Sequence, residues 1–381
     1  MRIPHLRHFT VFSIIGTVTL MPLLVLPAMV GVLVDNAGMS ESSAGWSASV
    51  HFLASAVVGL LMALRVHHVN LRQVATFALA FAVLADLASA LTAGETVAFF
   101  AARLAAGFML GATYVASVSS FARFDGYERG FGLFVTLQFI ISGLGLYVVP
   151  VYADELGATG LFGLFAALDG LALLLARFLP SENASREARG DSGSELKILL
   201  TASAIFAIIG FALFEAANNA QFTYIERFGV AIDISDQKIG VALLIASLIG
   251  IPGAFSIVVF GQRFGTLGPL VFGMAIAVAG LLVLISANSY GAYLFGSCCM
   301  GFSWAFCLPF IQSLLATIDR KGSAIAAGTS FSTFGSALGP GIAAIVVAGG
   351  KYANVFMLSI GLFAITLALF TYANKKRLGR L

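Results

Sequence analysis

The most constraining feature of this chain is an internal repeat. Residues 101–145 resemble residues 295–339, and the likeness extends along both halves at an offset of 194 positions without a gap. Matching pairs occur in several different apolar segments: Phe12 with Phe206, Gly16 with Gly210, Gly107 with Gly301, Asp125 with Asp319, and Gly145 with Gly339. Because the matches are spread so widely, the repeated unit is half of the protein. This pattern predicts two membrane bundles built to one plan.

The composition indicates an integral membrane protein. The chain is 59% hydrophobic and 10% charged, whereas a soluble domain carries roughly 25% charged residues. A helix needs about 20 apolar residues to cross the hydrocarbon. Such runs occur at 10–34, 45–64, 73–92, 96–121, 131–152, 159–178, 198–225, 237–260, 269–287, 291–315, 323–348 and 354–373. We therefore expect an all-α membrane protein with 12 transmembrane helices, arranged as two six-helix bundles.

One long polar connection separates the two halves. Residues 180–195 are rich in charged and turn-forming side chains, while the other connections are short. We expect an N-terminal bundle over 1–179, a cytoplasmic linker over 180–197 and a C-terminal bundle over 198–381. The short connections leave little room for a soluble catalytic domain, so the sequence does not favour an enzyme.

The basic residues predict the orientation in the membrane. Of the 21 lysines and arginines, Arg227, Lys238 and Lys351 fall on one side, Arg103 falls inside a span, and the other 17 fall on the opposite side. The positive-inside rule then puts both termini in the cytoplasm. We expect a multi-pass plasma-membrane protein, in a bacterium the inner membrane. The net charge of +3 reports this topology and gives no reason to expect a nucleic-acid partner.

Several motifs resemble the major facilitator superfamily of secondary transporters. Arg103 followed by Gly107 resembles the family's fourth span, the segment from Gly301 to Trp304 resembles the tenth, and the segment from Gly335 to Pro340 resembles the eleventh. The resemblance covers nearly the whole chain. It implies a six-plus-six fold, transport by alternating access, and a cavity lined by spans 1, 4, 5, 7, 10 and 11.

The chain also departs from the family pattern in two places. The segment 59–68, between spans two and three, lacks the family's Asp and its second Gly. The fifth span, at 143–147, lacks the Gly-Pro pair that is typical of drug/proton antiporters. The second departure makes a multidrug exporter less favoured without excluding it.

Four charged residues fall inside predicted spans and well away from the span ends, where charge is costly: Asp86, Arg103, Asp169 and Glu215. Glu215 is the strongest candidate for function. Together with Asn218, Asn219 and Phe222 it forms a series at i, i+3, i+4 and i+7, which is one face of a helix. Removal from water disfavours the ionised form of a carboxyl group, so Glu215 is a candidate to exchange protons or to bind a polar solute. It is alternatively held by its neighbouring amides as a link between helices.

Arg103 allows two interpretations. It shares a helix face with Gly107, Gly111 and Tyr114, and Asp86 lies at a similar depth in the preceding span, so an internal ion pair and a substrate contact are both open. The family resemblance associates this Arg with proton coupling, or with a substrate carboxylate.

The other ionisable groups in spans have simpler interpretations. Asp169 lies in the sixth span, which supports the bundle from outside the cavity in the resembled fold, so we expect a structural role. A lone His51 in the second span is more often a hydrogen-bonded packing residue than a titrating one.

Further polar side chains fall on the spans that the resemblance places around the cavity. They include Gln138 on span five, Trp304 and Gln312 on span ten, and Thr333 with Ser332 and Ser336 on span eleven. Hydroxyl groups and glycines also stabilise contacts between membrane helices. Helix packing alone can therefore explain the row of polar side chains, or polar stripe, on any single span. Taken together, the stripes favour a polar cavity.

The sequence as a whole favours a secondary active transporter for a small organic solute. We expect a monomer in the lipid bilayer, without a cofactor other than a coupling ion, since neither a metal-ligand spacing nor a phosphate-binding loop pattern occurs. Protons are favoured over sodium. A drug or metabolite efflux antiporter is the alternative, and a non-transporting sensor or a polytopic membrane enzyme is the alternative from another class.

Overall fold

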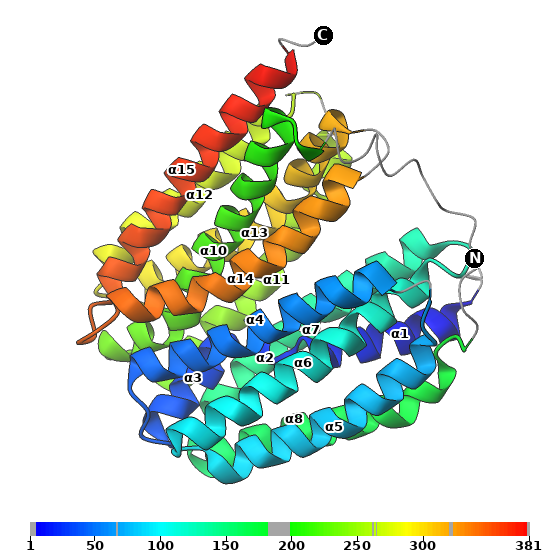
Figure 1. Cartoon of the computed structure of the whole chain (residues 1–381). Coiled ribbons are helices and arrows are strands. Elements are labelled where there is room, and N and C mark those ends of the chain that lie inside the picture. The colour runs from blue at the N-terminus through cyan, green and yellow to red at the C-terminus, as the bar shows by residue number, and fades with distance from the viewer. Residues whose placement is uncertain are drawn as a thin grey trace. The chain divides into compact units, whose positions relative to one another are not determined.

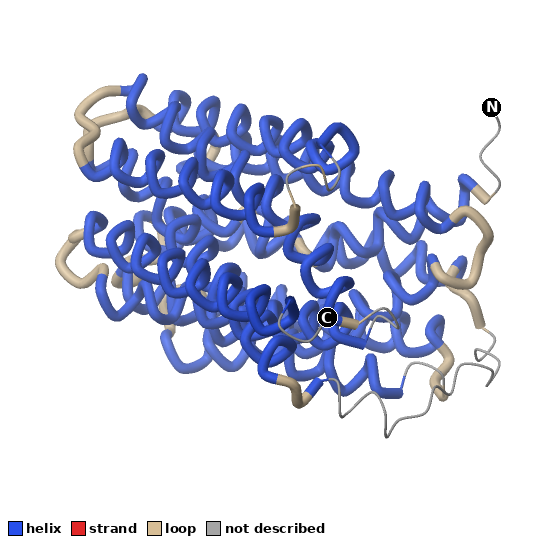
Figure 2. The backbone as a smooth tube through the Cα atoms, turned by 90° about the horizontal axis from the view of Figure 1, so that it is seen from above, coloured by secondary structure: helices blue, strands red, loops and turns tan. Residues whose placement is uncertain are grey.

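The computed structural model describes residues 5–65, 68–181, 199–260, 263, 265–319 and 323–378. All secondary structure in these residues is helical (Figure 2), and ten of their helices are long and apolar enough to cross a membrane. The chain divides into two compact units, unit 1 of residues 1–187 and unit 2 of residues 188–381. Most of the predicted linker, 182–197, lies outside the described residues.

Each predicted span is helical in the structure (Figure 1). The helices of unit 1 are α1 (Leu6–Thr19), α2 (Met21–Leu24), α3 (Leu26–Asp35), α4 (Glu41–Arg65), α5 (Leu71–Thr92), α6 (Thr96–Phe121), α7 (Tyr127–Val151) and α8 (Ala153–Leu175), followed by the short 3-10 helix η1 (Ala176–Phe178). Those of unit 2 are α10 (Ala202–Ala231), α11 (Asp236–Phe260), α12 (Leu267–Ile285), α13 (Tyr290–Ile318), α14 (Ser323–Val346) and α15 (Tyr352–Leu378).

The first predicted span is broken, although its counterpart in unit 2 is continuous. Helix α1 ends before Leu20 and α2 ends before Val25, so three short helices cover this span. Pro22 and Pro27 lie in the first turns of α2 and α3, where proline is tolerated because those backbone N–H groups have no partner within the helix. The equivalent positions in unit 2 are Ala216 and Gln221, and α10 runs through them without a break.

Helix α14 is the other predicted span that is not among the ten candidate membrane helices. It is a single helix of 24 residues, but it carries six hydroxyl side chains, which lower its hydropathy. Its length still suffices to cross hydrocarbon, since about 20 residues are needed.

The two units repeat the same pairs of packed helices. In unit 1, α4 and α5 both pack on α6, α5 packs on α8, and α1 packs on α7. In unit 2, α11 and α12 both pack on α13, α12 packs on α15, and α10 packs on α14. These are the same pairs at the repeat offset, so the duplication predicted from the sequence extends to tertiary packing.

Equivalent glycines allow the closest of these contacts. A Cβ atom at Gly107 on α6 would overlap the carbonyl oxygen of His51 on α4, and a Cβ atom at Gly301 on α13 would overlap that of Ala246 on α11. Without a side chain, the two backbones approach directly, as is common between membrane helices. The repeat therefore preserves the residues that set the helix spacing.

We predict that Gly301→Ala lowers the free energy of unfolding by about 1–3 kcal/mol, because the added methyl group must displace the backbone of α11. The measurement is the midpoint of thermal unfolding of the purified protein in detergent. Gly163→Ala on α8 is the matched control, since nothing lies within 4 Å of a Cβ there. It should be neutral or stabilise the protein by up to about 1 kcal/mol. Equal midpoints for the two variants would contradict this account of helix spacing.

Candidate functional site

Glu215 is the centre of a hydrogen-bonded cluster inside unit 2. Its side chain, on α10, is only 6% exposed. Trp304 Nε1 on α13 donates to Glu215 Oε1 at 3.2 Å. Ser336 Oγ on α14 and Asn219 Nδ2 on α10 both donate to Oε2, each at 3.3 Å. Three helices of one unit thus supply neutral donors to a single buried carboxyl group.

The polar face of α10 continues beyond Glu215 as a series of amide side chains. Asn218 Nδ2 donates to the carbonyl oxygen of Phe214 at 2.8 Å, and Gln221 Nε2 donates to Asn218 Oδ1 at 3.2 Å. Gln221 Oε1 is buried, and no donor in the described part of the chain bonds to it. The hydrogen bond between Gln221 and Asn218 makes these amides an ordered polar strip next to the carboxyl group, in which Gln221 Oε1 is left without a donor among the described residues.

Close packing of α14 on α10 brings Ser336 to the carboxyl group. A Cβ atom at Gly335 would overlap the carbonyl oxygen of Ala212, and one at Gly339 would lie 2.7 Å from that of Ala216. The two glycines flank Ser336, so its hydroxyl lies where the two helices are closest. Ser336 was not among the predicted site residues proper, although it belongs to the hydroxyl stripe recognised on this span.

Several predicted site residues lie outside the Glu215 cluster. Gln312 and Thr333 are exposed side chains of unit 2, and the Thr333 hydroxyl donates to the carbonyl oxygen of Ser330 at 2.7 Å. Gln138 and Tyr114 are half-buried side chains of unit 1. Their roles in binding remain predictions. The structure brings Glu215, Asn219 and Trp304 together, with Asn218 one turn along the same helix.

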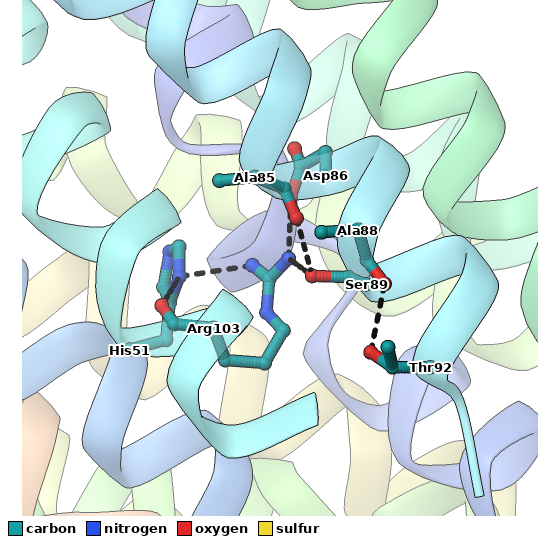
Figure 3. A network of polar contacts seen from close by, with 7 residues as sticks. All are labelled: His51, Ala85, Asp86, Ala88, Ser89, Thr92 and Arg103. Carbon is teal, nitrogen blue, oxygen red and sulfur yellow. Dashed lines mark hydrogen bonds and ion pairs between the residues drawn. The ribbon is translucent and has the colours of Figure 1, made fainter. Parts of the chain in front are cut away.

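Arg103 lies in a second polar network, inside unit 1 (Figure 3). Its Nη1 donates to Asp86 Oδ1 at 2.5 Å and to Ser89 Oγ at 3.3 Å. Its Nη2 lies 2.9 Å from His51 Nδ1. The same nitrogen lies 3.2 Å from the carbonyl oxygen of Arg103, so it accepts from the guanidinium group in one tautomer of the imidazole and donates to this carbonyl in the other. The sequence did not predict that His51 and Ser89 contact Arg103.

The guanidinium group of Arg103 is fully enclosed. The side chain is 2% exposed and that of Asp86 is 0% exposed. The ring of Phe162, on α8, lies 5.0 Å from the Arg103 Cζ atom, a distance at which a cation is attracted to an aromatic face. Side chains of α4, α5, α6 and α8 surround the charge. Of the two interpretations of Arg103 that the sequence left open, the structure contains the internal ion pair.

Such a fold, with a duplicated set of apolar helices, is that of a multi-pass membrane protein. The family model of the Major Facilitator Superfamily matches residues 9–340. The chain belongs to this superfamily, whose members are secondary transporters and not enzymes, and it therefore moves a small-molecule substrate.

Solved structures show the same fold at low sequence identity. A mutant of the nucleoside transporter NupG has a TM-score of 0.79 and 14% identity, with 96% of this chain and 99% of that chain covered. A bacterial homolog of the human lysosomal transporter Spinster, inward-facing and unoccupied, has a TM-score of 0.74 and 13% identity, with 100% and 99% covered. The human organic anion transporter TETRAN has a TM-score of 0.67 and 18% identity, with 97% and 100% covered. Curated proteins give no significant match.

We predict that Arg103→Gln lowers the stability of the protein by about 3–5 kcal/mol, because it leaves the Asp86 carboxylate buried without its counter-ion. Thermal unfolding in detergent measures the change. Arg129→Gln on α7, where the arginine is exposed, is the control and should unfold at the wild-type temperature. If Arg103→Gln unfolds at that temperature too, the ion pair is not a structural requirement of unit 1.

Proposed function

We propose that this secondary transporter couples the movement of a small organic solute to protons, with Glu215 as the proton-carrying group. The observation that supports this proposal is the set of partners around the Glu215 carboxyl group. Trp304, Ser336 and Asn219 are all neutral donors, and within the described residues no lysine or arginine forms an ion pair with Glu215.

A buried carboxyl group without a cationic partner is suited to exchange a proton. Hydrogen bonds from neutral donors stabilise the ionised form only in part, while burial in a low-dielectric interior disfavours it. The two protonation states of Glu215 are therefore closer in free energy than those of a carboxylate paired with arginine. Alternating access would then expose this group to one side of the membrane at a time, together with the solute.

The polar groups around Glu215 favour a hydroxylated or cationic solute over an anion. Asn218 and Gln221 offer amide groups beside the carboxyl, and the partly exposed ring of Trp304 offers an aromatic face. The positive charge that would recognise an anion, that of Arg103, is already neutralised by Asp86. We therefore place the solute at the polar face of α10 and assign Arg103 no direct contact with it.

The orientation is also part of the proposal. The excess of basic residues on one side of the predicted spans supports cytoplasmic termini in the plasma membrane. The proposed domain limits are 1–179 and 198–381, with the polar residues 180–197 as a cytoplasmic linker. Tagging of each terminus, followed by accessibility measurements in intact cells, tests this orientation.

We predict that Glu215→Gln abolishes solute-dependent proton movement, because the amide has the shape of the acid but cannot release a proton. The measurement is the pH change inside proteoliposomes when solute is added outside. Glu155→Gln, at an exposed glutamate of α8, is the matched control and should retain the wild-type signal. Coupling that is unchanged in Glu215→Gln, at normal expression, would end the proposal.

A solute screen by thermal stabilisation tests the proposed substrate class. We predict that neutral hydroxylated solutes or organic cations raise the unfolding temperature, with a stabilisation of about 2.7 kcal/mol at a concentration of 100 times Kd. Asn218→Ala should reduce the shift, measured from its own baseline, while Asn288→Ala at an exposed loop position should not. Stabilisation by carboxylate anions alone would contradict the proposed class.

A further inference from the structure

Three arginines of unit 1 gather around the short helix η1, where α1, α5 and α8 all make contact with it (Figure 1). The Arg7 Cζ atom, at the start of α1, lies 5.0 Å from the centre of the Phe178 ring, and the Arg177 Cζ atom lies 4.8 Å from the same point. Arg72 Nε, at the start of α5, donates to the carbonyl oxygen of Leu179 at 2.8 Å. We refer to Arg7, Arg72 and Arg177 as the basic cluster.

Most hydrogen-bond donors of the basic cluster are unused. A guanidinium group has five N–H donors. Within the described residues, the guanidinium groups of Arg7 and Arg177 form no hydrogen bond and no ion pair, and that of Arg72 uses its Nε alone. Attraction to an aromatic ring holds a cation in place, but it leaves the charge uncompensated. Since Arg7 and Arg177 are exposed, the cluster can bind an anion from outside.

The repeat shows that the fold does not require the basic cluster. At the offset of 194, each of its arginines corresponds to a threonine: Thr201, Thr266 and Thr371. The ring of Phe178 is kept as Tyr372, with one cation, Lys376 Nζ, 5.6 Å from its centre. Helices α10 and α12 nevertheless pack on α15 as α1 and α5 pack on α8. The three arginines are therefore an addition to a scaffold that packs without them.

The basic cluster lies at the end of two membrane spans. The candidate spans are Leu71–Thr92, which begins beside Arg72, and Ala153–Phe178, which ends beside Arg177. Leu171 and Leu174 precede Arg177 at helical spacing on α8, and both are exposed large apolar side chains. In a bilayer, such side chains meet acyl chains, while arginines at the span end reach the headgroup layer. Charge and apolar surface thus adjoin at the depth where phospholipids carry both.

We infer that the basic cluster is a binding site for an anionic phospholipid, with the lipid phosphate at the guanidinium groups and an acyl chain along the exposed leucines of α8. A planar guanidinium group can donate two parallel hydrogen bonds to phosphate oxygens, and basic pockets between membrane helices bind lipid headgroups. A soluble phosphate compound offers the same oxygens but nothing for the apolar surface. The inference rests neither on proton coupling by Glu215 nor on the proposed orientation.

Native mass spectrometry of the full-length protein in detergent micelles tests this inference, because it counts the lipids that stay bound. We expect the wild type to retain phosphatidylglycerol at one site. Phosphatidylcholine, with the same acyl chains and no net charge, should not be retained at the same concentration. This comparison needs no variant.

Variants assign the retained lipid to the basic cluster. The double variant Arg7→Gln, Arg177→Gln should bind phosphatidylglycerol about 30-fold more weakly, the loss expected when two basic residues next to an anionic lipid are removed. Arg72 is left in place because it also binds the backbone at Leu179. The matched control, Arg129→Gln with Lys375→Gln, removes two exposed charges elsewhere and should keep the wild-type affinity.

Inorganic phosphate distinguishes a lipid from a soluble anion. At the concentration of the lipid, it should leave the bound phosphatidylglycerol in place, because it has no acyl chain to contact α8. Displacement of the lipid under these conditions would overturn the assignment to a phospholipid. Equal retention of phosphatidylglycerol and phosphatidylcholine by the wild type would overturn it too, as would equal phosphatidylglycerol affinities of the Arg7→Gln, Arg177→Gln variant and its control.

Discussion

The hydrocarbon of the bilayer offers no water to polar groups, and this constraint accounts for most of the structure. Backbone groups are satisfied within the helices, as they must be in lipid. A side-chain charge can remain inside only if the protein itself supplies its partners. Arg103 meets this condition with Asp86, Ser89 and His51, whereas Glu215 meets it with neutral donors alone. The difference between these two solutions underlies the different roles assigned to them.

The two units share one arrangement of packed helices, but their buried ionisable residues lie at different positions in it. Glu215 corresponds to Met21, a buried apolar residue in the broken first span. Arg103 corresponds to Ser297, in a helix pair that packs without charge. Packing is thus conserved between the units while the ionisable groups are not. Such asymmetry is expected where function resides in sites placed on a common fold.

The sequence predicted the fold, and the spacing of part of the Glu215 cluster, for identifiable physical reasons. Long apolar runs and the repeat are properties of the chain itself, so the helices and their grouping in halves could be read directly. The spacing of Glu215 and Asn219 also defines a helix face without reference to other helices. The breaks at Leu20 and Val25 were not predicted, because a proline inside a span is compatible with both a kink and a chain break.

Contacts between side chains of different helices could not be predicted from the sequence. The meeting of Arg103 with His51 depends on how far α4 is shifted along α6, and that register is set by backbone contacts at Gly107 and Gly111. The contact of Ser336 with Glu215 depends in the same way on Gly335 and Gly339. Small residues indicate that helices approach closely, but not at which register they do so.

The central claim is that this chain uses a proton gradient to move its solute. The most direct measurement is solute accumulation in sodium-free proteoliposomes under an imposed pH gradient, with no solute gradient at the start. The account predicts that solute is concentrated on one side of the membrane and that this stops when an ionophore collapses the pH gradient. Transport that only equalises the solute on both sides, or accumulation that requires sodium, would contradict it.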